Sequence, residues 1–475
     1  MSFPRKRESI KRLPCPLTPE QAFAAFASGP DTAILNSSMR TDAGRYSFIG
    51  VDPFLVFTSK GASFSIRSDG GVTDGHGDPL EALRSILEEN RVVNDTALPF
   101  ISGGIGYFSY DLKNMIERLP EKALDDVGMP DIRFVFYRTI LIFDSEDPGY
   151  VTVSSFDADG TGLRDPEDLA RSLSGLDTRY KIQDTKKYDT PPPISSNFTK
   201  QEYLSAIGRG LEHIRAGDIY QLCLTQRFRT RWERDAYELY MKLNGINPAP
   251  FSAYLNSGDH KIISSSPELF LRRRGNVIET RPMKGTRPRG DNTGGDERSR
   301  LELVNSQKDI SELLMITDLE RNDLGRIAVP GSVEVAEHRR VEAYPTVFQT
   351  IAVIRGIVAE RTDNMDIIRA SFPGGSITGC PKIRAMEIID ELEPTSRGVY
   401  TGAIGYLSFH DDMELNIAIR TMVAKGDDVY FQAGGGIVSD SDPEAEYEET
   451  LVKARALIES LGPREYRPQA VHNIA

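Results

Sequence analysis

The stretch TKQEYLSAIGRGLEHIRAGDIYQLCLTQRF, residues 199–228, places a helix and a strand in one continuous segment. Thr199, followed three residues later by Glu202, has the form of a helix capping box, and Gly217 with Asp218 marks a turn. The apolar run after the turn has the composition of a strand. The segment therefore predicts a protein that mixes helices and strands.

Further strands are predicted on both sides of this segment. Residues 32–60 and 131–155 contain short apolar runs broken by turn residues, whereas residues 78–93 carry apolar side chains at helical spacing. The segments GGIGYFSY (103–110) and GAIGYLSF (402–409) echo each other. Both are predicted as strands whose glycines lie where backbones approach closely, although so short an echo does not establish a duplication.

The chain has 475 residues, so we expect two lobes or one large elaborated domain. Three prolines in DTPPPISSNFT, residues 189–199, place a boundary there. We predict a disordered tail at 1–16, an N-terminal domain at 17–155, a linker at 156–197, a second domain at 198–460 and a C-terminal tail at 461–475.

Charge and composition exclude several classes of function. The chain has 57 basic and 70 acidic residues, a net charge of −13, which argues against a nucleic-acid or anionic-membrane partner. No apolar run approaches the roughly 18 residues of a membrane span, and the basic N-terminus lacks the apolar part of a secretory signal. Cys15, Cys223 and Cys380 lie far apart, so neither disulfides nor a zinc site are expected. We expect a reducing, cytoplasmic setting.

Two acidic segments carry candidate ligands for a cation. In QKDISELLMITDLERNDLGR, residues 307–326, Asp309 and Glu312 share a helix face, and apolar residues nearly all round the helix predict that it is buried. Buried carboxylates need a partner or a cation.

The second acidic segment is SDPEAEYEETLVKARALIESLG, residues 441–462, where an apolar stripe leaves Glu446, Glu449 and Lys453 on the opposite helix face. Taken alone, these residues fit a solvated face with a Glu449–Lys453 pair. Together with Asp309 and Glu312 they fit a Mg²⁺ site, but the sequence alone does not bring the two helices together.

Two further motifs contain candidate site residues. SFPGGSITGCPKIRAMEIIDELE, residues 371–393, has Ser376 and Thr378 in a glycine-rich turn and Pro381 near the start of a helix. Free N–H groups there suit a carboxylate or phosphate, and Thr378 can equally cap the helix. Glu268 follows a proline in SSSPELF, residues 264–270; a glutamate in a turn is usually solvated, so an acid role for it depends on context.

Lys284 lies in RPMKGTRPRG, residues 281–290, among the cations Arg281, Arg287 and Arg289. A free lysine amine has a pKa near 10.4, so only about one in 2,500 is a nucleophile at pH 7. Neighbouring cations such as Arg281 and Arg287, with partial burial, would lower that pKa. From these residues alone, a basic surface loop is the default interpretation of such a run.

These motifs, in this order, resemble the chorismate-utilising enzymes, in particular the large subunits of anthranilate synthase and aminodeoxychorismate synthase. The similarity spans about 198–457, with GRYSFIGVDP, residues 44–53, similar to the N-terminal domain of those subunits. The resemblance implies an α+β fold in which antiparallel β-sheets pack as a sandwich with helices outside, and a chorismate site that requires Mg²⁺.

The resemblance also implies roles for single residues. Glu312 and Glu449 match the metal carboxylates of the family, with Asp309 and Glu446 near them. The positions that match contacts to substrate carboxylates and their surroundings are Ser376, Tyr400, Arg420, Gly436 and Lys453.

Three positions distinguish the reactions within this family. Gln221 stands where isochorismate and salicylate synthases carry a lysine that activates water, and an amide cannot be a general base. Lys284 stands where aminodeoxychorismate synthases typically have lysine and anthranilate synthases alanine. Gln349 replaces a histidine that is tied in anthranilate synthases to pyruvate elimination, so loss of the enolpyruvyl group is disfavoured.

The resemblance therefore favours synthesis of 4-amino-4-deoxychorismate from chorismate and ammonia, an early step of folate synthesis. Lys284 is the expected nucleophile and Glu268 the expected acid, and a separate glutamine amidotransferase subunit is the expected source of ammonia. The alternatives are anthranilate synthase component I and a non-catalytic tryptophan-binding relative. Intact Glu268, Lys284, Glu312 and Glu449 argue against the latter.

Overall fold

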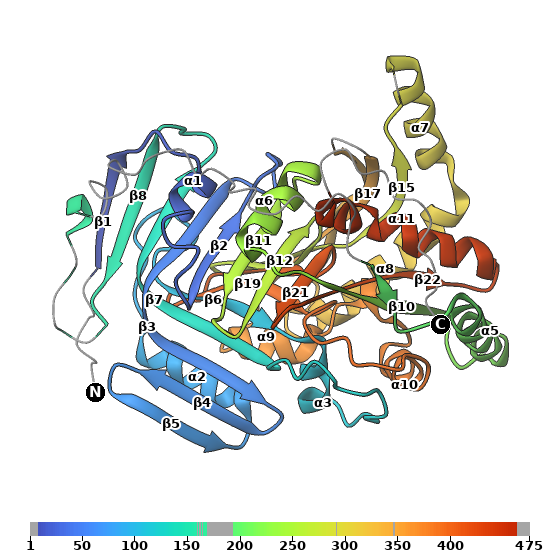
Figure 1. The fold of residues 1–475 in the computed structure, drawn as a ribbon, viewed down its shortest axis with the longest axis horizontal. Coiled ribbons are helices and arrows are strands. Elements are labelled where there is room, and N and C mark those ends of the chain that lie inside the picture. Colours follow the sequence, from blue (N-terminus) through green and yellow to red (C-terminus); the bar gives the residue numbers. More distant parts are fainter. Residues whose placement is uncertain are drawn as a thin grey trace.

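The structure is a computed structural model that describes residues 8–462, apart from residues 159, 161–162, 164, 169–192, 291 and 345–346. Its strands form one antiparallel hydrogen-bonded series that folds back on itself, with helices outside (Figure 1). The predicted α+β class with packed antiparallel sheets is confirmed. In the described part of the chain, no helix is long and apolar enough to cross a membrane.

The first half of the strand series brings together strands that are distant in the sequence. In order of pairing it runs β10 (Gln221–Arg231), β22 (Asp428–Ile437), β21 (Thr421–Lys425), β12 (His260–Ser266), β11 (Phe251–Asn256), β2 (Thr32–Asn36) and β3 (Tyr46–Lys60). The short strands β9 (Ser195–Ser196) and β18 (Gly379–Cys380) also pair with β10.

The second half of the series starts where β3 pairs with β7 (Ile132–Asp144). It continues through β6 (Gly103–Phe108), β19 (Ala403–Ser408), β20 (Met413–Ile417), β13 (Leu269–Arg274), β14 (Val277–Arg281) and β17 (Val347–Ile357), which also pairs with β15 (Met283–Pro288) and β16 (Glu334–Ala343). The hairpin of β4 (Ser63–Ser68) and β5 (Gly71–His76) extends β3, and β8 (Tyr150–Phe156) extends β7.

The two halves pack face to face across a shared apolar core. Ile262 and Leu255 from the first half meet Tyr107, Ile404 and Tyr406 from the second half in one buried cluster. This packing removes apolar surface from water on both sheets, the main favourable term in folding.

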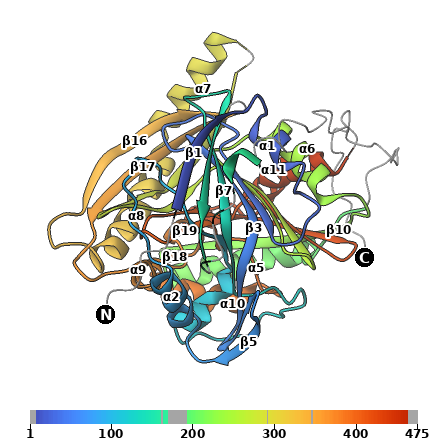
Figure 2. The ribbon, with the colours of Figure 1, turned by 90° about the vertical axis from the view of Figure 1, so that its left-hand side faces the viewer.

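Helices cover the outer faces of the strands. Those on the first half are α1 (Pro19–Phe23), α6 (Ala236–Ile246) and α11 (Pro443–Leu461), with α5 (Lys200–Ala216) and α10 (Lys382–Leu392) on β10 and β22. Those on the second half are α2 (Pro79–Glu89), α8 (Gln307–Gly325) and α9 (Asn364–Ser371). Figure 2 shows β16, β17 and α8 on one side of the strands, with α6 and α11 on the other. Three further elements are α3 (Lys113–Ile116), α7 (Thr293–Asn305) and the 3₁₀ turn η2 (Gly375–Ile377).

The predictions of a capped helix, a turn and a strand in residues 199–228 are confirmed. Thr199 and Glu202 form the capping box of α5, and Gly217 ends that helix in the left-handed conformation, with φ of 81°. The two echoing segments are the adjacent strands β6 and β19, in which Gly106 lies opposite Gly405. A Cβ at Gly405 would lie 1.8 Å from the carbonyl oxygen of Glu414, so only glycine permits this approach.

Two predictions about organisation need correction. Residues 8–14 of the predicted tail form β1 (Glu8–Pro14), which pairs with β8, because an edge strand needs no continuous apolar pattern. The predicted N-terminal and second domains share hydrogen-bonded strands, through β2 with β11 and β6 with β19. Most of the predicted linker and residues 463–475 of the C-terminal tail lie outside the described residues.

Candidate active site

Lys284 lies at a bulge of β15, beside β17. Its backbone is opposite Thr350, the register shifts between Lys284 and Thr286, and Gly285 between them has a φ of 74°. The Lys284 side chain reaches toward Gly436 on β22: a Cβ at Gly436 would lie 3.5 Å from Lys284 Nζ. The bulge therefore directs the amine of Lys284 across to a strand of the other half of the fold.

The arginines beside Lys284 have acidic partners of their own. Arg281 pairs with Glu279 at 2.8 Å and with Asp42 at 3.0 Å, and Arg287 pairs with Asp309 at 2.8 Å. The charges of Arg281 and Arg287 are thus compensated locally. The sequence gives no sign of this, because it does not show where Asp42 and Glu279 lie.

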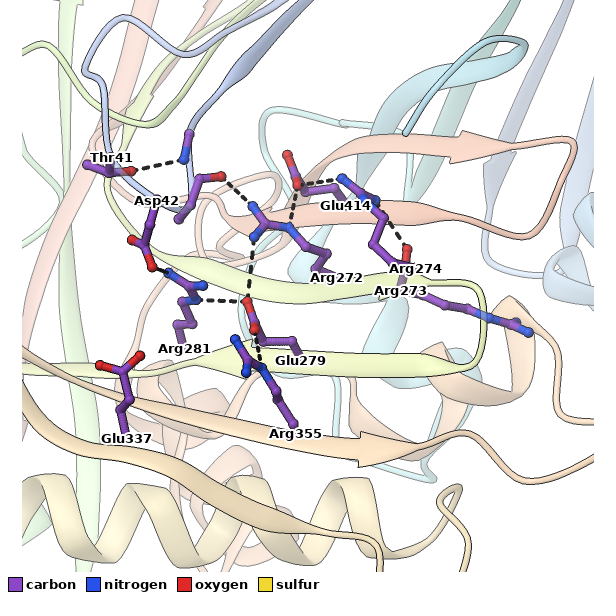
Figure 3. Close-up of polar contacts among 12 residues, drawn as sticks. Thr41, Asp42, Arg272, Arg273, Arg274, Glu279, Arg281, Glu337, Arg355 and Glu414 are labelled. Carbon is purple, nitrogen blue, oxygen red and sulfur yellow. Dashed lines mark hydrogen bonds and ion pairs between the residues drawn. The ribbon is translucent and has the colours of Figure 1, made fainter. Parts of the chain in front are cut away.

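The partners of Arg281 belong to a larger ionic network on the β13–β14 hairpin (Figure 3). Glu279 also binds Arg355 at 2.7 Å, and Arg272 joins Glu279 to Glu414. Burial alone would raise the pKa of Glu279, but the surrounding arginines hold it below its ordinary value. This network anchors the strand that leads into Lys284.

Glu268 is buried between β12 and β13, with only 4% of its surface exposed. Its backbone N–H donates to Ser266 Oγ at 3.3 Å, and its carbonyl accepts from the N–H of Ile417 at 3.0 Å. Burial raises the pKa of Glu268 to about 7, although the Ser376 hydroxyl and the charge of Lys284 act in the opposite direction. A carboxyl with this pKa can both give and take a proton near neutral pH.

The two predicted acidic helices meet beside the amine of Lys284. A Cβ at Gly435 would lie 3.0 Å from Glu446 Oε2 and 3.4 Å from Glu449 Oε1, so both carboxylates of α11 lie over this glycine of β22. Burial raises the pKa of Glu312 on α8, Lys284 lowers it, and the charge of Glu449 raises it further. Glu312 and Glu449 are therefore electrostatic neighbours, as the Mg²⁺ prediction requires.

Lysines partly compensate these carboxylates. Lys308 lies 3.9 Å from Glu312 and 3.5 Å from Glu446, and Lys453 lies 2.6 Å from Glu449. Burial alone would raise the pKa of Glu449, but Lys453 brings it below its ordinary value. The side chains of Glu449 and Lys453 remain 42% and 45% exposed, so a ligand can reach them.

Lys453 and Ser376, two of the residues predicted to bind substrate carboxylates, lie at this centre. Lys453 Nζ donates to the carbonyl of Gly434 at 2.9 Å, and the Ser376 hydroxyl bonds to Glu268. Arg420 donates to Asn247 Oδ1 at 3.1 Å, and no ion pair of the described residues includes it. Burial lowers the pKa of Arg420, because it removes the charged guanidinium from water. A carboxylate bound beside Arg420 would offset this desolvation cost. Tyr400 is buried, and burial raises its pKa above the ordinary value.

The two distinguishing glutamines lie close to Lys284. Gln221 on β10 is fully buried, and a Cβ at Gly436 would lie 2.7 Å from its Nε2. Gln349 on β17 donates to Thr286 Oγ1 at 3.2 Å, and its Oε1 has no partner among the described residues. Both amides can therefore contact a molecule held beside Lys284.

Two local predictions are wrong. Helix α8 is not buried all round, because Leu314 is 53% exposed and only one face of the helix packs on the sheet. Thr378 does not cap α10; its hydroxyl donates to the carbonyls of Gly374 and Gly375, and Pro381 is the N-cap residue.

Sequence reasoning also missed Glu320, a buried acid of α8. Glu320 is 3% exposed and accepts the N–H of Gly375 at 2.9 Å. It lies four residues from Ile316 and from Leu324, on the face of α8 that packs inward. That spacing was a usable signal, since a carboxylate in an apolar stripe is rarely buried without a specific role.

Residues 37–459 match the family model of chorismate binding enzymes, which covers most of the chain. The chain is a chorismate-binding enzyme. Aminodeoxychorismate synthase component 1 of Bacillus subtilis is 36% identical over 448 residues, covering 93% of this chain and 94% of the relative. Anthranilate synthase component 1 of Acetivibrio thermocellus is 36% identical over 457 residues, covering 94% and 92%.

The solved structures agree with this assignment. Anthranilate synthase component I from Streptococcus pneumoniae has a TM-score of 0.75 and 31% identity, covering 88% of this chorismate-binding enzyme and 93% of that chain. Because relatives of both kinds have the same identity to this chorismate-binding enzyme, overall similarity does not distinguish between their two reactions. That choice depends on individual residues of the site.

Proposed function

We propose that this chorismate-binding enzyme is an aminodeoxychorismate synthase large subunit, which converts chorismate and ammonia to 4-amino-4-deoxychorismate for 4-aminobenzoate and folate synthesis. The proposal depends on Lys284, whose amine lies among Glu268, Glu312 and Glu449, as their mutual charge effects show. A structural surface lysine would not be directed into a group of candidate substrate-binding and acidic side chains.

Lys284 and Glu268 supply the first displacement. Neutral Lys284 attacks C2 of chorismate, both ring double bonds shift by one position toward C4, and the C4–oxygen bond breaks. Protonated Glu268 gives its proton to the departing hydroxyl, which leaves as water. The reactive pair thus holds one proton, carried by Glu268 while Lys284 is neutral.

Ammonia completes the second displacement. It adds at C4, the double bonds shift back, and the C2–nitrogen bond breaks with its electron pair returning to Lys284. Glu268 takes the extra proton from the new C4 ammonium group, which regenerates both residues. The Gln221 amide can hydrogen-bond to ammonia or substrate but cannot deprotonate water, so ammonia rather than hydroxide is the nucleophile.

The site fits a Mg²⁺ ion, which we propose as the cofactor. Glu446 Oε2 is buried without a partner in the described residues, and Gly435 leaves room beside the Glu446 and Glu449 carboxylates. The described His, Cys, Asp and Glu side chains form no cluster of three or more that would enclose a metal. Mg²⁺ suits such an open arrangement, because it binds few carboxylates and keeps waters or substrate oxygens.

In this arrangement Glu312 and Glu449 would hold the ion, with Glu446 beside them. Bound Mg²⁺ would neutralise the ring carboxylate of chorismate and stabilise negative charge that shifts through the ring. Asp309 binds Arg287, so we assign it to the surroundings of the ion. Arg420, Tyr400, Ser376, Gly436 and Lys453 are the proposed contacts to the rest of the substrate.

Anthranilate synthase is the second candidate, and the equal identity of relatives of that kind favours it. Attack of ammonia at C2 with loss of the C4 hydroxyl as water, followed by loss of pyruvate, would give anthranilate. Two residues oppose this reaction: in the proposed mechanism Lys284 attacks C2 itself, and the amide of Gln349 cannot move a proton as imidazole does. We also propose a separate glutaminase subunit as the source of ammonia, in a cytoplasmic setting.

Mass spectrometry of the purified chain with chorismate, Mg²⁺ and an ammonium salt at mildly alkaline pH tests the proposal. We expect aminodeoxychorismate, which an added lyase converts to 4-aminobenzoate. Anthranilate and pyruvate would overturn the proposal in favour of the second candidate. A folded chain that converts nothing would indicate a non-catalytic relative.

A further inference from the structure

Glu320 of α8 lies behind the acid Glu268, outside the set of residues that contact substrate in the proposed reaction. Its Oε1 accepts the N–H of Gly375 at 2.9 Å, and its buried Oε2 has no partner among the described residues. An isolated ionised carboxylate is costly to bury, so such a group calls for an explanation.

The turn η2 connects Glu320 to Glu268. A Cβ at Gly375 would lie 2.5 Å from Leu319 Cδ2 and 3.1 Å from Glu320 Oε1, so the turn rests directly on α8. The next residue, Ser376, bonds through its hydroxyl to Glu268. Two buried carboxyls thus hold one short turn, one through its backbone and one through its side chain.

Glu320 and Glu268 have different charged neighbours. Glu320 faces Asp323 on its own helix, Lys382 at the start of α10, and Glu268 across the turn. Lys382 is already paired with Asp323 at 2.5 Å, and Arg326 also acts on Asp323. Glu268 faces Lys284 and Lys453, and Tyr344 lies within range of its charge. Glu320 therefore has no cation of its own among the described ion pairs.

We propose that Glu320 is a positioning residue for Glu268: it fixes the Gly375–Ser376 turn, and its negative charge favours the protonated form of Glu268. The proposal rests on the proposed function, in which Glu268 must carry the proton while Lys284 is neutral. Like charges disfavour joint ionisation, so each carboxylate makes it harder for the other to ionise.

The charge of Glu320 should shift the pH dependence of catalysis in a defined direction. Burial raises the pKa of both Glu268 and Glu320 to about 7, and the charge of Glu268 contributes to the shift at Glu320. Removing the charge of Glu320 lowers the pKa of Glu268, and the fraction of enzyme with protonated Glu268 and neutral Lys284 falls with it. Without the charge of Glu320, the acidic limb of the pH profile of kcat/KM therefore moves to lower pH, and the maximal value of kcat/KM falls.

The test compares Glu320→Gln with Asp318→Asn in the full chain, at constant free ammonia. The glutamine carbonyl can still accept the Gly375 N–H, whereas Asp318 is an exposed acid of the same helix paired with Arg321. For Glu320→Gln we expect the acidic limb to move to lower pH by about 0.5 unit or more. The maximal kcat/KM should fall about 3-fold or more, since 0.5 pH unit is about a 3-fold factor. Asp318→Asn should match the wild type in both.

If the acidic limb of Glu320→Gln stays at the wild-type pH, the charge of Glu320 does not act on Glu268 as proposed, whether or not the maximal kcat/KM falls. If that variant does not fold, Glu320→Asp tests the positioning role, because it keeps the charge but its shorter side chain releases Gly375. Its limb should stay in place while kcat falls, and full activity would overturn the proposal.

Failure of the proposed function is recognised separately, from Glu268→Gln. If that variant keeps the wild-type activity and acidic limb, Glu268 is not the acid, whatever Glu320 does. If Glu268→Gln loses activity but Glu320→Gln leaves the profile unchanged, only the further inference fails.

Discussion

Gln221 and Lys284 approach the same glycine, Gly436, from two different strands. A Cβ at Gly436 would lie 2.7 Å from Gln221 Nε2 and 3.5 Å from Lys284 Nζ. Strand β10 carries the amide and β15 carries the amine, so the two halves of the fold each contribute one group. A glycine at this point lets both side chains approach the strand, because a side chain at position 436 would collide with the Gln221 amide.

The first prediction concerns Lys284. Lys284→Ala should lower formation of aminodeoxychorismate by on the order of 10³-fold or more, because it removes the proposed nucleophile. Wild-type enzyme quenched with chorismate but without ammonia should show a peptide containing Lys284 with the added mass of chorismate less one water. Lys261→Ala is the matched control, because it removes a partly exposed lysine whose amine donates to the carbonyl of Gly258, away from the proposed site. A Lys284→Ala enzyme with full activity would refute the covalent role.

The elements around Lys284 could be predicted from local patterns, but their meeting could not. Capping residues and turn signals in 199–228 specify α5 and β10 because these interactions are local. The ion pair between Arg281 and Asp42 joins residues distant in the sequence, and no local signal reports it. The acidic partners of the arginines beside Lys284 could therefore not be predicted, although the motif RPMKGTRPRG indicated a site there.

The candidate site itself was predicted mainly through resemblance. Spacing placed Glu446 and Glu449 on one face of a helix, but only the fold places that face over Gly435 and beside Glu312. The position of Glu268 shows the same limit: a glutamate in a turn is usually solvated, yet Glu268, in the connection between β12 and β13, is only 4% exposed.

The second prediction concerns the titration of Glu268. Its pKa of about 7 in the folded chain lies above its ordinary 4.5, so the folded state binds a proton more tightly than the unfolded state. The stability of the fold therefore falls as pH rises from 4.5 to 7, and the full cost is present above 7. Glu268→Gln removes this cost and should raise the free energy of unfolding by about 3 kcal/mol at pH 8.

The same substitution should lower kcat/KM by about 10²- to 10⁴-fold, because the departing hydroxyl loses its acid. Urea unfolding at pH 8 and pH 5 measures the stability effect, which should shrink below about 1 kcal/mol at pH 5. A difference in stability that is the same at both values would show that Glu268 does not titrate as proposed.

The third prediction concerns Mg²⁺ and has a readout other than activity. Mg²⁺ at about 100 times its Kd should raise the free energy of unfolding of the wild type by about 2.7 kcal/mol. Glu449→Gln should lose most of this gain, since one of the two proposed carboxylate ligands is gone. Glu448→Gln changes the neighbouring glutamate, which is 62% exposed on the outer side of α11, and should keep it. Equal stabilisation of all three proteins would place the ion elsewhere.

The last prediction concerns the choice between the two reactions. In the double variant Lys284→Ala, Gln349→His, the covalent route is closed and an imidazole takes the place of the amide beside Thr286. Imidazole can move a proton near neutral pH, so elimination of the enolpyruvyl group becomes accessible. We expect this variant to release pyruvate and anthranilate, measured by a coupled assay for pyruvate and by fluorescence, with Lys284→Ala alone as the reference. If the double variant releases no more pyruvate than Lys284→Ala, then Gln349 does not decide the fate of the enolpyruvyl group, and the retention of that group must be set by how the other side chains hold the ring.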